Sequence, residues 1–345
     1  MKRIWFNVGL SNVRDAVEMI RKAAMGRVSL VASHSDPVSP VLAAADQAFL
    51  EPTFDVSDAS GEVAYLAYCV EICATSKIDL FVPQRHRRIL ADHAAAFAVV
   101  GTRLAIPAGR ETLDLLHDKA AFHDAARAAG LPMPRTHVAT TVAEFDAGVA
   151  DLKAAGLQGC VKPAKGVYGM GYWRLVAEQT LFAALMNPDA RVISPADMRR
   201  ALAGAVDPAP LLVLEYLEGP EWSLDCVCEN GSLIAGVGRR KMGRAQRLET
   251  TGPIFDIARR AIARFGLSGL INVQFKAAVD PRDIRLLEIN SRMSGGCAQT
   301  ALSGVNLPWL SVAIPLGLID AADIPVATDG VLVTTVTTPE LARSW

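Results

Sequence analysis

The sequence has little that would direct the chain to a membrane or to nucleic acid. It has no uncharged apolar run of about 18 residues, the length that a membrane-spanning helix needs. Its first residues reach the polar Asn7 too early for a secretory signal peptide. The 35 lysines and arginines nearly balance the 36 acids, and a formal net charge of −1 argues against a surface that coats nucleic acid or anionic lipid. We therefore expect a cytoplasmic protein that binds neither a membrane nor a nucleic acid.

The chain also lacks the cysteine spacing of redox and zinc motifs, because none of its six cysteines forms a CxxC pair. Reduced thiols in a cytoplasmic enzyme are the simplest interpretation. Cys226 and Cys228 would share one face of a strand, where ordinary packing is the simpler alternative to a metal-binding pair. The sequence contains no internal repeat. The loop 7–11 is not GxGxxG, so a dinucleotide site has little support.

What the chain does have is enough apolar material for sizeable cores. Hydrophobic residues make up 51% and charged residues 21% of its 345 residues, which excludes general disorder. At about 150 residues per domain, this length predicts two or three domains.

The first 110 residues alternate between strand-like apolar runs and helical patterns. The predicted elements are strands at 2–8, 27–32 and 78–83 and helices at 12–24 and 62–75. This rhythm is typical of a small parallel sheet with crossover helices. The loop 7–11 and residues 33–36 follow predicted strands and are therefore candidates for setting substrate specificity.

The rest of the chain mixes helices with longer strands. Thr141 and Glu144 form a capping-box pattern that predicts the start of a helix. Asn230-Gly231 is a hairpin turn signal between two apolar runs. Two further strands are predicted at 270–277 and 284–290, joined by a polar turn.

The predicted strand 284–290 ends in polar side chains. Glu288 and Asn290 are two residues apart, so on a strand they face the same side. Arg292 follows where the strand ends, and Gln274 on the preceding strand could add a third oxygen. Oxygen ligands beside a cation suit Mg²⁺ that bridges phosphates, with the arginine bound to phosphate or to a developing acyl phosphate. A solvated strand face is the simpler alternative for this pattern alone.

A lysine and a glycine-bearing loop follow another predicted strand, at 159–163. Lys162 is costly to bury unless it meets an anion. The glycines of residues 165–171 would let backbone N–H groups approach phosphate oxygens. A plain hairpin, with a lysine that extends to solvent, would give the same pattern.

The predicted strand 211–216 runs into a turn with several glutamates. Backbone groups near Glu215 could bind the edge of adenine, and Glu221 could accept hydrogen bonds from ribose hydroxyls. An edge strand followed by a charged turn is the alternative. Lys119 precedes an amphipathic helix, where it could face phosphate or belong to a charged helix face.

Residues 239–247 hold five basic residues and no acid. The segment could bind a triphosphate or a carboxylate substrate, form a solvated face, or contact nucleic acid. Its position between the strand 211–216 and the proposed metal strands favours the first. Arg239 and Lys241 would lie on one face if the strand continues, so both are candidate catalytic residues.

The order of these motifs resembles that of the ATP-grasp superfamily. Along the chain they are Asp118-Lys119, GLPMP (130–134), VKPAKGVYGMG (161–171), LEYLEGPEWSLD (214–225), NVQF (272–275) and LLEINSRMSGG (286–296). The resemblance covers about residues 110 to 310, and the leading α/β unit is similar to the domain that precedes the ATP-grasp core.

The resemblance implies a fold of mixed α/β and α+β type. An N-terminal α/β (pre-ATP-grasp) domain would occupy residues 1–110 and precede a two-lobed ATP-grasp fold. The central lobe would span residues 111–217, and the C-terminal lobe with the metal site would span residues 218–345.

The resemblance also implies a role for each candidate residue. ATP would be bound by Lys119, Lys162, Lys165, Gly169, Glu215, Tyr216, Leu217 and Glu221. Mg²⁺ would be held by Gln274, Glu288 and Asn290. Arg292 would stabilise the transferring phosphoryl group, and Arg239 and Lys241 would assist at the triphosphate or the substrate. The loop 165–171 would be a mobile flap over the phosphates.

One ligand departs from the common ATP-grasp pattern. Many members carry a carboxylate where this chain has Gln274. The set of Gln274, Glu288 and Asn290 looks like that of the carbamoyl phosphate synthetase large subunit, and it implies at least one Mg²⁺.

The activity implied by the resemblance is that of a carboxylate–amine ligase. Such an enzyme activates a small-molecule carboxylate as an acyl phosphate for attack by an amine or a similar nucleophile, and it releases ADP and phosphate. An ATP-dependent small-molecule kinase and a non-catalytic nucleotide-binding module are the alternatives. A homodimer is a reasonable expectation for the assembly.

Overall fold

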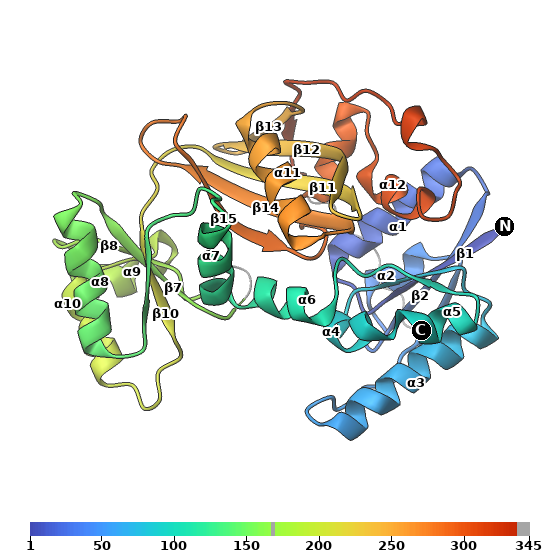
Figure 1. Ribbon diagram of the computed structural model, residues 1–345, viewed down its shortest axis with the longest axis horizontal. Coiled ribbons are helices and arrows are strands. Elements are labelled where there is room, and N and C mark those ends of the chain that lie inside the picture. Colours follow the sequence, from blue (N-terminus) through green and yellow to red (C-terminus); the bar gives the residue numbers. More distant parts are fainter. Residues whose placement is uncertain (167–169, 337–345) are drawn as a thin grey trace. The chain divides into compact units, whose positions relative to one another are not determined.

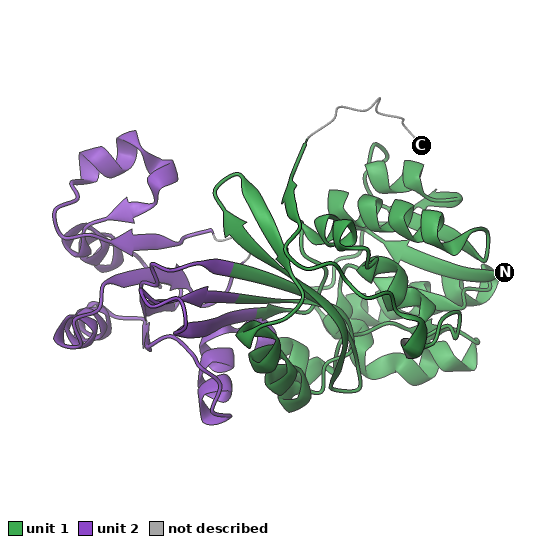
Figure 2. Ribbon diagram, turned by 90° about the horizontal axis from the view of Figure 1, so that it is seen from above, with its two compact units in different colours: residues 1–114, 222–274, 289–345 green, residues 115–221, 275–288 purple. Residues whose placement is uncertain are grey.

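The computed structural model describes residues 1–166 and 170–336. The chain divides into two compact units, which Figure 2 shows in different colours. Unit 1 comprises Met1–Asp114, Trp222–Gln274 and Ile289–Trp345, and unit 2 comprises Leu115–Glu221 and Phe275–Glu288. The described strands form three sheets with helices packed on them, so the predicted mixture of α/β and α+β structure is confirmed (Figure 1).

The N-terminal part of unit 1 is a parallel sheet with the strand order β3-β2-β1-β4-β5. Its strands are β1 (Lys2–Asn7), β2 (Val28–His34), β3 (Gln47–Leu50), β4 (Leu80–Pro83) and β5 (Arg103–Leu104). The helices of this part are α1 (Ser11–Ala24), α2 (Pro40–Ala44), α3 (Ala59–Thr75), α4 (Arg87–Leu90), η1 (Ala91–His93) and α5 (Ala94–Val99). The helix α6 (Arg110–His117) begins in unit 1 and ends in unit 2. The predicted alternation of strands and helices is therefore present, with β3 and β5 as additional edge strands.

The amphipathic pattern of α1 explains how this sheet is covered. Val13, Val17 and Ile20 recur at helical spacing, and all three are buried. They share a hydrophobic cluster with Ile4 of β1 and Leu30 of β2. The periodicity of the sequence thus fixes which face of α1 packs on the sheet.

Unit 2 contains a five-stranded sheet with the order β6-β10-β7-β8-β9. Its strands are β6 (Thr136–Ala139), β7 (Gly159–Pro163), β8 (Trp173–Leu175), β9 (Val192–Ile193) and β10 (Leu211–Glu215). Its helices are α7 (Lys119–Ala128), α8 (Val142–Ala154), α9 (Leu181–Met186), η2 (Pro188–Ala190) and α10 (Pro195–Ala203). The predicted capping box at α8 is confirmed, because the Thr141 hydroxyl accepts from the Glu144 N–H and the Glu144 side chain accepts from the Thr141 N–H.

The third sheet has the strand order β15-β14-β11-β12-β13-β16. Its strands are β11 (Glu221–Glu229), β12 (Ser232–Met242), β13 (Ala245–Glu249), β14 (Gly269–Ala277), β15 (Ile284–Asn290) and β16 (Leu332–Thr334). The remaining helices are α11 (Pro253–Phe265), η3 (Cys297–Ser303), α12 (Leu307–Ala313) and η4 (Ala321–Asp323).

The predicted turn between β11 and β12 is confirmed by its backbone. Asn230 and Gly231 both have positive φ, +46° and +79°, as a two-residue hairpin turn requires. None of the helices in residues 1–166 and 170–336 combines the length and the apolar character that crossing a membrane demands.

Candidate functional site

Two of the motifs expected to bind phosphate meet at the start of α7 in unit 2. The Asp118 carboxylate caps the helix by accepting hydrogen bonds from N–H groups of its first turn. Lys119 Nζ donates to the Gly166 carbonyl at 2.6 Å, and its backbone N–H donates to the Ala164 carbonyl at 3.0 Å. Lys165 Nζ lies 3.6 Å from the Asp118 carboxylate. The structure therefore brings Lys119 and the beginning of the glycine-bearing loop together, whereas Gly169 lies outside the described residues.

Lys162 adds a second cation to this part of unit 2. It lies on β7 opposite Leu212 of β10, and its side chain is half-buried. Burial lowers the pKa of Lys162, and the positive charge of Lys119 lowers it further, while the Glu288 carboxylate acts in the opposite direction. Lys119, Lys162 and Glu288 therefore lie close enough to influence one another. The two neighbouring positive charges make a place that favours an anion.

Sequence reasoning did not identify His123, which lies in the same region. Its side chain is 1% exposed, and Nε2 donates to the Leu287 carbonyl at 3.1 Å. Burial and the charges of Lys162, Arg127 and Lys119 lower the pKa of His123 to about 3, so the ring is neutral at physiological pH. The sequence carried no distinctive signal for this buried, neutral histidine, because a single histidine in a helix is equally compatible with an exposed position.

The predicted adenine-binding segment follows β10. Glu215 is buried, and its carboxylate accepts a hydrogen bond from Arg285 Nε at 3.3 Å. The Tyr216 ring has the Arg174 guanidinium 4.4 Å and the Lys276 ammonium 5.1 Å from its centroid. The three basic partners were not expected from the sequence, since they come from β8, β14 and β15.

The other two residues of this segment differ in exposure. Leu217 is buried with 5% exposure, and Glu221 is half-buried at the start of β11. The segment therefore presents an apolar side chain, an aromatic ring and a carboxylate within a few residues of one another.

The three predicted metal ligands lie on neighbouring strands of the third sheet. Gln274 is on β14, and Glu288 and Asn290 are on β15, the strand next to it. Each of the three side chains is half-buried. Glu288 and Asn290 are two residues apart on one strand, so both side chains project from the same face. A carboxylate and two amides supply the oxygen atoms that Mg²⁺ prefers, so the chemistry of the donor set fits this ion.

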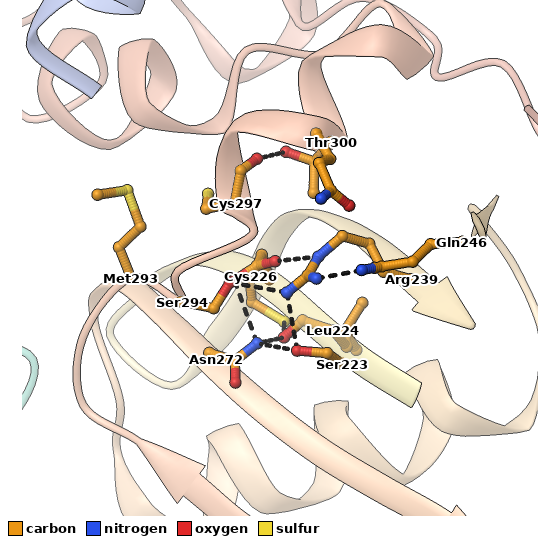
Figure 3. Close-up of polar contacts among 12 residues, drawn as sticks. Ser223, Leu224, Cys226, Arg239, Gln246, Asn272, Met293, Ser294, Cys297 and Thr300 are labelled. Atoms are coloured by element: carbon orange, nitrogen blue, oxygen red, sulfur yellow. Dashed lines mark hydrogen bonds and ion pairs between the residues drawn. The ribbon is translucent and has the colours of Figure 1, made fainter. Parts of the chain in front are cut away.

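Arg239 in unit 1 occupies a buried polar network (Figure 3). Its Nε donates to the Asp225 carboxylate at 3.0 Å, and Nη1 donates to Gln246 at 2.9 Å. Nη2 donates to the hydroxyls of Ser223 at 2.9 Å and Ser294 at 2.7 Å. Arg239 is 5% exposed and Asp225 is fully buried. These contacts favour a role for Arg239 in positioning the chain near Ser294 over direct contact with a substrate.

The loop that follows β15 packs closely against this arginine. A Cβ atom added to Gly296 would lie 2.3 Å from Arg239 Nη1. The glycine is therefore required for contact with the guanidinium group. Lys241, two residues after Arg239, is exposed near the tip of the β12–β13 hairpin, so the structure separates the environments of these two candidate residues.

Arg292 lies beyond the end of β15 beside a residue that sequence reasoning missed. Arg87 at the start of α4 donates from Nη1 to the Ser291 carbonyl at 2.7 Å. Arg87 and Arg292 are both half-buried, and both line one pocket of unit 1. Arg87 stands in the run Gln84-Arg85-His86-Arg87-Arg88 that follows β4, and the position of that run after a parallel strand was the available signal.

Comparison with known proteins supports the resemblance to ATP-grasp proteins. Residues 207–339 match a family model described as "ATP-grasp in the biosynthetic pathway with Ter operon". The resemblance to the ATP-grasp superfamily that the sequence indicated is therefore confirmed, and the chain has the ATP-grasp fold.

Solved structures with this fold are similar over most of the chain. The L-amino acid ligase of Bacillus licheniformis is 13% identical, with a TM-score of 0.62 over 94% of this chain and 76% of that chain. An ADP complex of N5-carboxyaminoimidazole ribonucleotide synthetase is 16% identical, with a TM-score of 0.65 over 95% and 79%. A biotin carboxylase–ATP-analogue complex from Campylobacter jejuni is 17% identical, with a TM-score of 0.60 over 94% and 73%. No curated protein sequence matches the chain.

Proposed function

We propose that the protein is an ATP-dependent ligase that joins a small-molecule carboxylate to an amine or a similar nucleophile. The observation that carries this proposal is the cluster of Lys119, Lys162 and Glu288 beside the glycine-bearing loop of unit 2. A cluster with two lysines and one carboxylate suits a nucleotide phosphate chain with its divalent cation.

The proposed reaction has two steps. In the first, a carboxylate oxygen attacks the γ-phosphorus of ATP, the bond to the β-phosphate oxygen breaks, and ADP leaves. In the second, the amine attacks the carbonyl carbon of the acyl phosphate and loses a proton, and inorganic phosphate leaves with the former carboxylate oxygen. In this reaction Arg292 would stabilise negative charge on the transferring group, and Lys119 and Lys162 would hold the nucleotide.

The remaining candidate residues would bind the nucleotide or the substrate, or would position the chain around them. Tyr216 and Leu217 would contact adenine, Glu221 would bind ribose, and the backbone at Glu215 would read the edge of the base. Lys165 would lie over the phosphates together with Gly169. Arg239 would hold the Ser294 loop, and Lys241 would contact the triphosphate or the substrate at the hairpin.

Gln274, Glu288 and Asn290 would hold Mg²⁺. When bound, the ion would neutralise charge on the phosphates and so favour phosphoryl transfer. Because two of these three ligands are neutral, Glu288 would supply the only formal negative charge of the set. The likeness of this set to that of the carbamoyl phosphate synthetase large subunit remains a prediction.

The experiment that tests the proposal is a screen for acid-dependent ADP release with hydroxylamine as the nucleophile. Amino acids should be the first acids in the screen, because one solved neighbour is an L-amino acid ligase. We expect one class of acid to give equal amounts of ADP and hydroxamate. If acids caused ADP release but none of them gave a hydroxamate, the acyl phosphate route would be contradicted.

Two further results separate the alternatives. A small-molecule kinase would accumulate a stable phosphorylated product with no second substrate, which phosphorus NMR would detect. A nucleotide-binding module would bind ATP and release no ADP with any acid. Glu288→Gln should abolish most of the turnover, whereas Glu71→Gln, which changes an exposed glutamate of α3, should not.

A further inference from the structure

The buried His123 joins segments of unit 2 that lie far apart in the sequence. Its Nε2 donates to the Leu287 carbonyl at 3.1 Å, and its Nδ1 lies 3.1 Å from the Thr136 hydroxyl. The three residues belong to α7, β15 and β6, and all three lie within unit 2. The ring therefore links α7 to β15, although 164 residues separate His123 from Leu287.

The chemistry of the ring fixes the direction of both hydrogen bonds. A backbone carbonyl can only accept, so the proton of the neutral ring lies on Nε2, and Nδ1 accepts from the Thr136 hydroxyl. His123 is 1% exposed, so water has little access to either nitrogen. An apolar side chain could fill the same space without needing either bond, and packing alone therefore does not account for a histidine at this position.

Each of the two linked segments carries a candidate residue beside the contact. Lys119 precedes His123 by four residues, about one helical turn, so both side chains lie on one face of α7. Glu288 directly follows Leu287 on β15. The charges of Lys162 and Lys119 both lower the pKa of His123, so the ring lies within reach of both lysines. His123 is thus placed between the cluster expected to bind phosphate and a predicted metal ligand.

The backbone supplies one further link between the same parts of unit 2. The Leu286 N–H donates to the carbonyl of Pro132, which lies between α7 and β6, at 2.7 Å. Two consecutive residues of β15 are therefore anchored, Leu286 through its N–H and Leu287 through its carbonyl. Glu288 is the next residue along the strand, so the bond from His123 is the last of these anchors before the predicted metal ligand.

We propose that His123 is a positioning residue that holds the Glu288 end of β15 in place relative to Lys119 and Lys162. This role rests on the proposed function, in which Glu288 binds Mg²⁺ and the two lysines bind the nucleotide phosphates. Without the bond to Leu287, the lysines still meet the phosphates, but the carboxylate that should hold the metal is less well placed. Loss of a residue that supports a metal ligand in this way typically costs about 10- to 100-fold in metal affinity or activity.

The first test compares two amides at position 123. The longer His123→Gln can donate to Leu287 from near the position of Nε2, whereas the shorter His123→Asn reaches only the position of Nδ1. Calorimetric titration with ADP, in Mg²⁺ and in EDTA, measures how the metal affects nucleotide affinity. His123→Asn should lose about 10- to 100-fold in affinity with Mg²⁺ and little in EDTA, and His123→Gln should stay within about threefold of the wild type. Equal losses in Mg²⁺ and EDTA, or equal effects of the two amides, would overturn the proposal.

The second test approaches the ring from its other nitrogen. Thr136→Val keeps the shape of the side chain but removes the hydroxyl that orients the ring, and it should weaken ADP binding in Mg²⁺ by about 3- to 10-fold. The control is His137→Leu, since His137 Nε2 lies 2.6 Å from the Asp151 carboxylate and joins β6 to α8, away from the bond to Leu287. His137→Leu should bind ADP as the wild type does. Wild-type affinity in both Thr136→Val and His123→Asn would contradict the positioning role, even if one His123 variant failed to fold.

These titrations also separate the role of His123 from the proposed function. If the wild-type protein binds ADP equally well in Mg²⁺ and in EDTA, the metal site of the proposed function fails, and the role of His123 fails with it. If the wild-type affinity depends on Mg²⁺ and that of His123→Asn depends on it as strongly, only the positioning role fails. If the variants behave as expected while no acid yields ADP, the ligase activity fails and the role of His123 at the nucleotide site stands.

Discussion

The Arg239 guanidinium and the Asp225 carboxylate form an ion pair of 3.0 Å in the interior of unit 1. Arg239 is 5% exposed and Asp225 is fully buried, so neither charge is stabilised by solvent. The same guanidinium binds Ser294 in the loop after β15, four residues beyond the end of that strand. The pair therefore links the β11–β12 hairpin to the segment that begins with Arg292.

Removal of one charge of this pair should be strongly destabilising. Asp225→Asn keeps the shape of the side chain but leaves a buried guanidinium without an opposing charge, and we expect a loss of about 3 kcal/mol in unfolding free energy. Asp256→Asn breaks a comparable pair with Arg259 that is exposed on α11, and it should cost less than about 1 kcal/mol. Urea denaturation of both variants measures the difference. Similar losses for the two would show that the buried pair does not stabilise the fold.

The second prediction concerns the stability of variants at Gly295 and Gly296, two neighbouring glycines in the loop after β15. Gly296→Ala would place its Cβ against the fixed Arg239 guanidinium, and overpacking of this kind costs about 1–3 kcal/mol. Gly295→Ala has no heavy atom within 4 Å of the added carbon, so a change below about 0.5 kcal/mol is expected. Thermal denaturation of the two variants makes the comparison, and equal midpoints would contradict the close approach of Gly296 to Arg239.

Lys162 should show opposite effects on stability and on nucleotide binding. Burial lowers the pKa of this lysine, which means that its charge is unfavourable in the folded protein. Lys162→Met should therefore leave the unfolding free energy unchanged or higher, and it should weaken ATP binding about 10-fold or more.

The exposed Lys153 of α8 is the matched control, because Lys153→Met removes the same charge from the surface of unit 2. Calorimetric titration with ATP and denaturation by urea give the two readouts. Loss of stability together with unchanged ATP affinity would assign Lys162 a structural role instead.

His123 predicts a pH dependence of stability. Its folded pKa of about 3 lies below the ordinary value of 6.5, so between these values the unfolded chain binds a proton that the folded protein does not. Stability is therefore lost as the pH falls below 6.5, by about 2 kcal/mol at about pH 5.

The non-titrating His123→Gln should remove this part of the pH dependence, whereas His93→Gln, which changes an exposed histidine, should retain it. Urea unfolding at about pH 7.5 and about pH 5 measures the slope. An equal loss at low pH in the wild-type and His123→Gln proteins would be inconsistent with a neutral, buried ring.

Local sequence patterns were sufficient to predict an element where that element is defined by consecutive residues. The helix α1 and the capping box of α8 follow from short-range periodicity and from side chains three residues apart. The strand β3 was not predicted, because it has only four residues and none of them is fully buried. A short, partly exposed edge strand has no alternation of polar and apolar residues that a sequence pattern could reveal.

The environment of Arg239 shows what local patterns do not contain. The turn at Asn230-Gly231 alone would place Arg239 opposite Trp222, with its side chain on the face away from Asp225. A bulge between Val227 and Cys228 shifts the register by one residue, so that Arg239 lies opposite Ser223 and on the same face as Asp225. The sequence indicated that Arg239 is of functional interest, but its pairing with the buried Asp225 depends on one bulge between β11 and β12.

In the candidate site, too, some contacts were expected from the sequence and others depend on the whole fold. The meeting of Lys119 with residues 164–166 was expected from the order of the motifs, and the structure places them in contact. The proximity of Arg87 to Arg292 was not predicted, because about 200 residues separate them and each was judged from its own neighbours. Contacts of this kind depend on how β4 and β15 are placed by the whole of unit 1.

The most direct test of the central claim follows one oxygen atom from the acid to the phosphate. The acid identified by ADP release would be labelled with heavy oxygen in its carboxylate, and the phosphate formed with ATP and an amine would be analysed by mass spectrometry. A ligase that works through an acyl phosphate transfers one labelled oxygen to each phosphate released. Phosphate without label, formed in step with the amide product, would contradict carboxylate activation by phosphoryl transfer.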